Sequence, residues 1–180
     1  MTRLRADAQR NLGRVLEAAA EAFAEHGPDV SVDEIARRAG VGHATVFRRF
    51  PTKDALLRAV LRDRLEQVAE LARAALEASD PDAAFTEFIW ALVAIHARDR
   101  GLHECFDRCT KEREAQEVER LMEQIVRRAQ EAGAIRHDVS PADVPNLIGA
   151  AIRSAPSDQR QLYVEIVLAG LRPPALAVTA

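Results

Sequence analysis

The residues of this sequence best suited to chemistry lie between Gly42 and Lys53, where two arginines, two threonines and a histidine accompany the lysine and no acidic residue occurs. Guanidinium and ammonium groups bind phosphate, and an arginine can also donate two hydrogen bonds to the major-groove edge of guanine. Arg48 and Arg49 are adjacent, and Thr45 adds a hydroxyl that can donate to phosphate. These residue types predict a surface that contacts the backbone and bases of DNA.

Two short helices must position this surface. Ser31 and Glu34 have the spacing of a capping box, in which the serine hydroxyl accepts from the Glu34 amide and the glutamate carboxylate reaches back. Gly40 is suited to end the first helix, and Pro51 prevents continuation of the second. The residues expected to face inward are Ile35, Ala39, Val41, Val46 and Phe50. The pattern predicts a helix-turn-helix over about 31–50, with the outer face of its second helix projecting from the body.

The charge of the chain is divided unevenly. The net charge is −3, yet residues 37–64 hold eight basic residues against two acids, a local net charge of +6, so the remainder carries −9. A basic segment on an acidic body suggests a nucleic-acid partner. Arg3 and Arg5 add a short basic arm that can reach a neighbouring phosphate or the minor groove. A helix-turn-helix pattern alone also fits a solvated, charged face on a helical hairpin, so that alternative stays open at this point.

The composition predicts an all-α fold of about nine helices. The 180 residues include 34 alanines, 8 aromatic residues, 8 glycines and 8 prolines. Alanine favours helices and is depleted in strands, which argues against an all-β or Rossmann-type fold. No apolar run is long enough for a transmembrane helix. Helical periodicity and stop signals predict helices at about 6–25, 32–39, 44–50, 53–78, 81–101, 102–109 and 111–132, and a ninth from Ser157 to Gly170. The eighth opens at Ser140–Asp143, and because of Pro145 either its first turn is distorted or its regular part starts near Val144.

Residues 8–65 resemble the DNA-binding domain of the TetR family of bacterial repressors. Four segments carry the resemblance: 15–19 (VLEAA), 23–27 (FAEHG), 31–41 (SVDEIARRAGV) and 45–57 (TVFRRFPTKDALL). The resemblance implies a DNA-binding domain at 1–52, an effector-binding and dimerisation domain at 53–175 and a tail at 176–180. It also implies a homodimer that places its third helices in successive major grooves of a palindromic operator, and a small-molecule effector that releases the dimer. Activation instead of repression is compatible with the same residues.

The resemblance also assigns roles within the site. Family residues that match Thr45, Phe47, Arg49 and Lys53 commonly touch phosphate, and those that match His43 and Ala44 face bases. Phe47 departs from the family, which usually has a tyrosine whose hydroxyl binds phosphate, so we expect Phe47 to contribute packing only. The full set of expected DNA-binding residues is Ser31, Gly42, His43, Ala44, Thr45, Phe47, Arg48, Arg49 and Lys53.

The remaining helices should supply the dimer and effector surfaces, and we expect the last two to form half of a four-helix bundle. The expected dimer residues are Leu147, Ile148, Ala151, Ile152, Leu162, Ile166 and Val167. The candidate residues for a small apolar or amphipathic ligand are Phe85, Phe88, Trp90, His96, His103 and Phe106. For both sets, packing into the protein's own core is the alternative. The effector and the operator sequence cannot be read from these residues.

Two cysteines, Cys105 and Cys109, are too few for a disulfide framework, and no signal peptide is recognisable, so we expect a cytoplasmic protein. A thiol or metal sensor at these cysteines is a minor alternative, because the pairs Cys105/Cys109 and His103/Asp107 lie on different sides of a helix and cannot converge on one ion. We expect no cofactor, metal site or catalytic residue. A helical enzyme or adaptor that does not bind DNA is the rival class.

Overall fold

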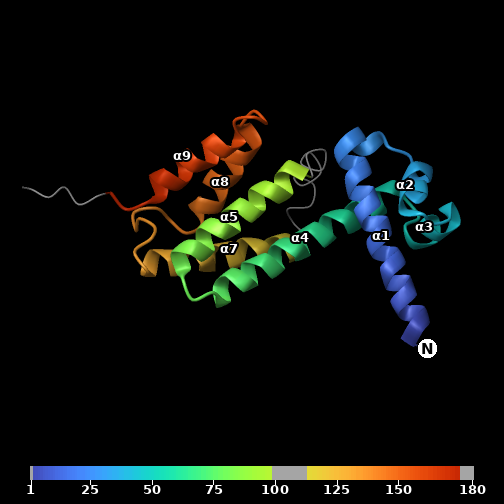
Figure 1. Cartoon of the computed structure of the whole chain (residues 1–180), viewed down its shortest axis with the longest axis horizontal. Coiled ribbons are helices and arrows are strands. Elements are labelled where there is room, and N and C mark those ends of the chain that lie inside the picture. The colour runs from blue at the N-terminus through green and yellow to red at the C-terminus, as the bar shows by residue number, and fades with distance from the viewer. Residues whose placement is uncertain (1, 99–112, 175–180) are drawn as a thin grey trace, which may run out of the picture. The chain divides into compact units, whose positions relative to one another are not determined.

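The computed structural model describes residues 2–98 and 113–174, and all regular structure within them is helical. The α-helices are α1 (Thr2–His26), α2 (Val32–Ala39), α3 (His43–Arg49), α4 (Lys53–Glu77), α5 (Pro81–Arg98), α7 (Arg113–Glu131), α8 (Asp143–Ser154) and α9 (Arg160–Leu171), with a short 3-10 helix η1 (Gly27–Asp29) after α1 (Figure 1). The all-α prediction is confirmed. The helix expected at 102–109 lies outside the described residues.

The chain forms two compact units, of which the first contains residues 1–66 and 98–114. In this unit α1, η1, α2, α3 and the first part of α4 surround one apolar core (Figure 1). Phe23 of α1, Ile35 of α2, Val46 of α3 and Leu56 of α4 are all at most 1% exposed. Because α3 is anchored through Val46, the other six side chains of this short helix are exposed.

The second unit contains residues 67–97 and 115–180. Its core is built from buried side chains of α5, α7 and α8, including Phe85, Phe88, Ile125 and Val144. The Arg128 guanidinium on α7 donates to two backbone carbonyl groups at the carboxyl end of α4, which satisfies acceptors that the helix itself leaves unpaired. Helices α8 and α9 pack against each other.

Side chains cap the amino ends of α4 and α5. The Thr52 hydroxyl accepts from the Ala55 amide at 3.1 Å before α4, and the Asp80 carboxylate accepts from two amides in the first turn of α5. α1 differs from the prediction because it begins at Thr2. Arg3 and Arg5 therefore belong to a helix and do not form an extended arm. Among the helices described, none has the length and apolar character needed to cross a membrane.

Candidate nucleic-acid interface

The turn between α2 and α3 is fixed by Gly40 and by an arginine of α1. Gly40 has φ +62° and ψ +37°, the left-handed conformation that glycine adopts without a steric penalty. The Gly40 amide donates to the Arg37 carbonyl, and the next amide donates to the Ala36 carbonyl, which is a Schellman motif. Arg14 Nη2 donates to the Ala39 carbonyl at 2.6 Å. The turn that sets the direction of α3 is therefore tied to α1 as well as to α2.

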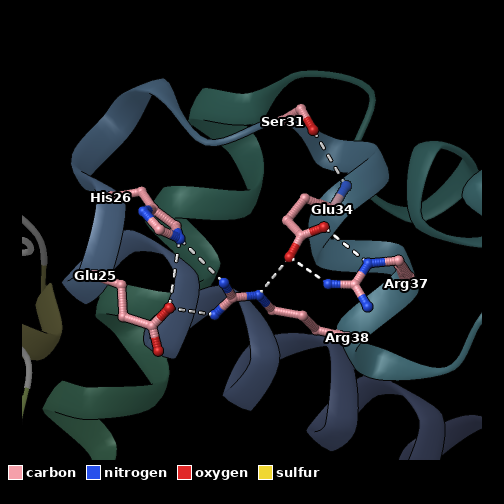
Figure 2. Close-up of polar contacts among 6 residues, drawn as sticks. All are labelled: Glu25, His26, Ser31, Glu34, Arg37 and Arg38. Carbon is pink, nitrogen blue, oxygen red and sulfur yellow. Dashed lines mark hydrogen bonds and ion pairs between the residues drawn. The ribbon is translucent and has the colours of Figure 1, made fainter.

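The start of α2 carries half of the predicted capping box. The Ser31 hydroxyl accepts from the Glu34 amide at 3.2 Å, as predicted. The predicted reciprocal bond, in which the Glu34 carboxylate accepts from the Ser31 amide, is wrong. The carboxylate accepts instead from Arg37 and Arg38 (Figure 2). Ser31, expected at the DNA, is exposed and has this structural role in the free protein.

Arg38 extends this cluster to the end of α1. Its guanidinium donates to Glu34 at 2.8 Å and to Glu25 at 2.7 Å, and Nη2 lies 3.1 Å from His26 Nε2 (Figure 2). The hydrogen bonds from Arg37 and then from Arg38 lower the pKa of Glu34 from 4.5 to about 2. Two of the basic residues in the +6 segment are thus paired with acids inside the domain.

The six exposed residues of α3 form what we call the outward face: His43, Ala44, Thr45, Phe47, Arg48 and Arg49. Phe47 is 53% exposed, and its ring stacks on His43 with the ring centroids 5.8 Å apart and the planes 16° apart. Gly42 is also exposed. It is the N-cap residue of α3, and its own backbone is extended. The sequence from Gly42 to Lys53 contains no acidic residue, but the structure brings one to the outward face. Asp33 of α2 has its Oδ1 atom 2.5 Å from His43 Nδ1.

Arg48 and Arg49 differ from the other arginines of residues 37–64. Arg37, Arg38, Arg58, Arg62 and Arg64 each have a carboxylate partner within 4 Å. Within the described residues, neither Arg48 nor Arg49 forms an ion pair or a hydrogen bond. Lys53, at the start of α4, is half-buried and does interact within the protein. Within residues 37–64, the arginines without a carboxylate partner therefore both lie on α3.

A groove of about 630 Å³ runs between α1 and α3, and we call it the α1–α3 groove. Its floor is apolar, and Thr45, Arg48 and Arg49 line it from the α3 side. Its lining from α1 consists of Ala8, Gln9, Asn11, Leu12 and Val15. The amides of Gln9 and Asn11 are polar groups beside the arginines that the sequence did not identify. They lie in a stretch of α1 that also contains Asp7 and Arg10, so no sequence pattern singles them out.

Two of the expected effector residues, Phe85 and Phe88, are buried in the core of the second unit. Phe85 and Phe88 line a void of about 10 Å³ in the core of the second unit, which is about the volume needed for one water molecule. Trp90 and His96 are half-buried, and His96 Nδ1 lies 3.1 Å from the carbonyl oxygen of Leu92, one turn back. His103 and Phe106 lie outside the described residues.

The expected dimer residues fall into two groups. Ile148, Ala151 and Ile152 are buried within the second unit, at 1%, 8% and 2% exposure, which fits the alternative that they pack into the protein's own core. They occupy the side of α8 that faces the protein's own core. Exposed apolar side chains on α8 and α9 are instead Leu147, Leu162, Tyr163 and Ile166, with Val167 half-buried.

Cys105 and Cys109, the residues of the sensor alternative, lie outside the described residues. Among the residues that are described, no three histidine, cysteine or acidic side chains come together as a metal site.

Comparison with known proteins identifies the family. Residues 15–60 match the model for bacterial regulatory proteins of the TetR family, and residues 80–173 match the model for the C-terminal domain of SbtR-like transcriptional regulators. A TetR transcription regulatory protein from Mycobacterium vanbaalenii is 37% identical, with a TM-score of 0.75, over 94% of this chain and 99% of that chain. A TetR regulator from Streptomyces coelicolor is 26% identical, with a TM-score of 0.75, over 91% of this chain and 99% of that chain.

Curated relatives match over less than half of this chain. A transcriptional regulator of Mycobacterium tuberculosis is 37% identical over 90 residues, which are 49% of this chain and 44% of that protein. The transcriptional repressor LfrR of Mycolicibacterium smegmatis is 40% identical over 73 residues, which are 41% of this chain and 36% of that protein. The matched segments thus span less than half the length of these relatives. The model that covers residues 80–173 and the 37% identity along nearly the whole solved chain show that this protein belongs to the TetR family of bacterial transcriptional regulators.

Proposed function

We propose that this protein is a homodimeric repressor that binds a palindromic DNA operator through α3 and is released by a small molecule bound in its C-terminal domain. It acts in the cytoplasm, with the DNA-binding domain at 1–52 and the effector and dimerisation domain at 53–175. Family membership supports regulation of transcription, and the charges on the outward face of α3 support DNA as the direct partner.

One observation carries the assignment of α3. Arg48 and Arg49 are exposed and have no carboxylate partner among the described residues, whereas the other five arginines of residues 37–64 are paired. An exposed arginine that already has an intramolecular partner must give up that interaction before it binds phosphate. Arg48 and Arg49 have no such cost, so the DNA backbone is their natural partner.

The outward face divides by chemistry. Thr45, Arg48 and Arg49 line the α1–α3 groove and are proposed to hold a DNA strand by its phosphates, with help from Gln9 and Asn11. Two further members of the outward face, His43 and Ala44, lie at the amino end of α3 and are proposed to meet base edges in the major groove. The proposed DNA-binding set otherwise keeps Ser31, Gly42, Phe47 and Lys53.

The dimer is proposed to form through exposed apolar residues of α8 and α9. Leu162 is 53% exposed and Ile166 is 61% exposed, and these two residues are one helical turn apart on α9. Leu147 of α8 and Tyr163 of α9 are also exposed. A second copy that covers these side chains removes apolar surface from water, which favours association.

The effector is proposed to enter the core of the second unit near Phe85 and Phe88. Pockets for small molecules usually measure hundreds of cubic ångströms, and the void beside these rings is about 10 Å³. Binding must therefore displace core side chains, and this coupling between ligand and packing is a physical route to a change of conformation.

An electrophoretic mobility assay tests the proposal on the DNA upstream of the gene that encodes this protein and of its divergent neighbour. We expect a complex with the size of a dimer, whose affinity falls steeply with salt, and a protected site with two half-sites about 10 base pairs apart. Binding that ignores both sequence and ionic strength would contradict a repressor, and the absence of any complex would favour the adaptor class.

A further inference from the structure

We propose that Asp33 is a specificity-determining residue: it holds His43 in one tautomer, so that His43 reads a base edge through Nε2. This inference rests on the proposed DNA-binding function and adds a residue of α2 to the reading of sequence by α3.

The geometry fixes where the proton of the imidazole lies. Asp33 Oδ1 and His43 Nδ1 are 2.5 Å apart, a hydrogen-bond distance that requires a proton between the two atoms. An ionised carboxylate can only accept, so the proton belongs to Nδ1. A neutral imidazole that donates through Nδ1 has its lone pair on Nε2. His43 thus presents an acceptor on the side of the ring that Asp33 does not engage.

The plane of the ring is fixed as well. Phe47 stacks on His43 with centroids 5.8 Å apart and planes 16° apart. The phenyl ring restrains one face of the imidazole, and the carboxylate restrains its Nδ1 edge. The side chain of His43 remains 52% exposed, so the restrained ring is accessible to a partner. An exposed side chain held on two sides is preorganised, and it loses less conformational entropy when it binds.

The position of the pair makes the tautomer important for sequence. His43 is the first residue of α3, and Asp33 lies in the first turn of α2, so the interaction joins the amino ends of the two helices. In the major groove, adenine N6 and cytosine N4 donate hydrogen bonds, whereas guanine presents only acceptors. An acceptor at Nε2 therefore selects a base with an exocyclic amino group and disfavours guanine at that position.

Two measurements at pH 8.5, where histidine side chains are ordinarily neutral, test this inference on the full chain. The first is the tautomer of His43 in the free protein, read from the ¹⁵N chemical shifts of its ring. We expect the Nδ1–H form in the wild type and a shift toward the Nε2–H form in Asp33→Ala. An unchanged tautomer ratio in Asp33→Ala overturns the inference whatever happens to DNA binding.

The second measurement is base preference, obtained by selecting bound sites from randomised DNA. We expect the wild type to prefer adenine or cytosine over guanine at one position of each half-site by roughly fivefold, the worth of about one hydrogen bond. Asp33→Ala, which removes the acceptor of the Nδ1 proton, should lose this preference, while preferences at the other positions remain. The control Asp29→Asn makes the same change of charge at an exposed acid of η1 and should keep the preference.

The outcomes separate the two proposals. If the protein selects no sequence at all, the proposed function fails. If it selects a two-fold site but Asp33→Ala leaves every base preference intact, the proposed function stands and the role of Asp33 is overturned.

Discussion

The turn before α3 offers a prediction whose size can be worked out from the structure, namely the effect of Gly40→Ala. Gly40 has φ +62°, and a Cβ atom built on it lies 2.5 Å from Arg14 Nη2. The substitution therefore does two things at once. It places an alanine in the left-handed conformation, and it displaces the guanidinium that donates to the Ala39 carbonyl at 2.6 Å.

The two costs can be added approximately. A residue with a Cβ atom in the left-handed conformation costs about 1–2 kcal/mol. Arg14 can move because the close atom is the far end of a flexible side chain, so its displacement costs about 1 kcal/mol, the worth of a hydrogen bond. We expect Gly40→Ala to lower the free energy of unfolding of the first unit by about 2–3 kcal/mol.

Gly27 provides a matched control. It has φ +68°, but no atom lies within 4 Å of a Cβ built there. Gly27→Ala should therefore cost only the conformational part, about 1–2 kcal/mol. Gly13, inside α1 with no neighbour within 4 Å of a built Cβ, should become more stable on substitution with alanine, by roughly 0.5–1 kcal/mol.

The assay is hydrogen exchange of the α2 amides together with urea unfolding followed by circular dichroism, because the single tryptophan, Trp90, belongs to the second unit. A double-mutant cycle isolates the arginine. Arg14→Ala alone should cost about 1 kcal/mol, and adding it to Gly40→Ala should cost almost nothing more. Equal costs for Gly27→Ala and Gly40→Ala, with additive effects of Arg14→Ala, would refute the reasoning.

Three further predictions concern other parts of the structure. The pKa of Glu34 is lowered from 4.5 to about 2, so its ion pairs stabilise the fold above pH 4.5 and are lost as the pH falls toward 2. Between pH 4.5 and pH 2, the thermal midpoint of Glu34→Gln should therefore fall less than that of the wild type. Phe47→Tyr should strengthen operator binding by roughly fivefold through a new bond to phosphate, and anisotropy titration that shows equal or weaker binding would mean that the ring lies away from the backbone. Ile166→Glu should convert the dimer to a monomer in analytical ultracentrifugation, whereas Ile148→Val, a change inside the core, should leave the dimer intact. Dissociation by the core variant, or a stable Ile166→Glu dimer, would place the interface elsewhere.

The helix boundaries of the first unit could be predicted because single residues determine them. Ser31 caps α2, Gly40 closes it in the left-handed conformation, and Thr52 caps α4. Each of these depends on side chains and amides within three residues of one another, and this short range is visible in a sequence.

The partners of charged side chains could not be predicted in the same way. Glu34 had a local partner in the expected capping box, but Arg37 and Arg38 lie one turn further along α2 and bind its carboxylate more strongly than a backbone amide. The pairing of Asp33 with His43 joins residues ten positions apart on different helices, and it depends on the angle between α2 and α3.

The expected dimer residues show that helical periodicity alone does not identify which side of a helix is buried. Helix α8 has apolar residues at adjacent positions, Leu147 and Ile148, and a sequence pattern cannot tell which one faces the protein's own core. The structure buries Ile148 at 1% exposure and leaves Leu147 at 45%. The proposed effector site is harder to predict, because buried aromatic residues at helical spacing also occur in an ordinary core.

The central claim is that Arg48 and Arg49 hold DNA by its phosphates, and the salt dependence of operator affinity tests it most directly. Each phosphate contact contributes about 0.9 to the slope of log affinity against log salt concentration. Arg48→Ala combined with Arg49→Ala should therefore reduce the slope by about 2 per protomer and about 4 per dimer. Arg120→Ala combined with Arg127→Ala, on the exposed face of α7, changes the net charge equally and should leave the slope almost unchanged. Equal slopes for the wild type and the Arg48/Arg49 variant would contradict the account.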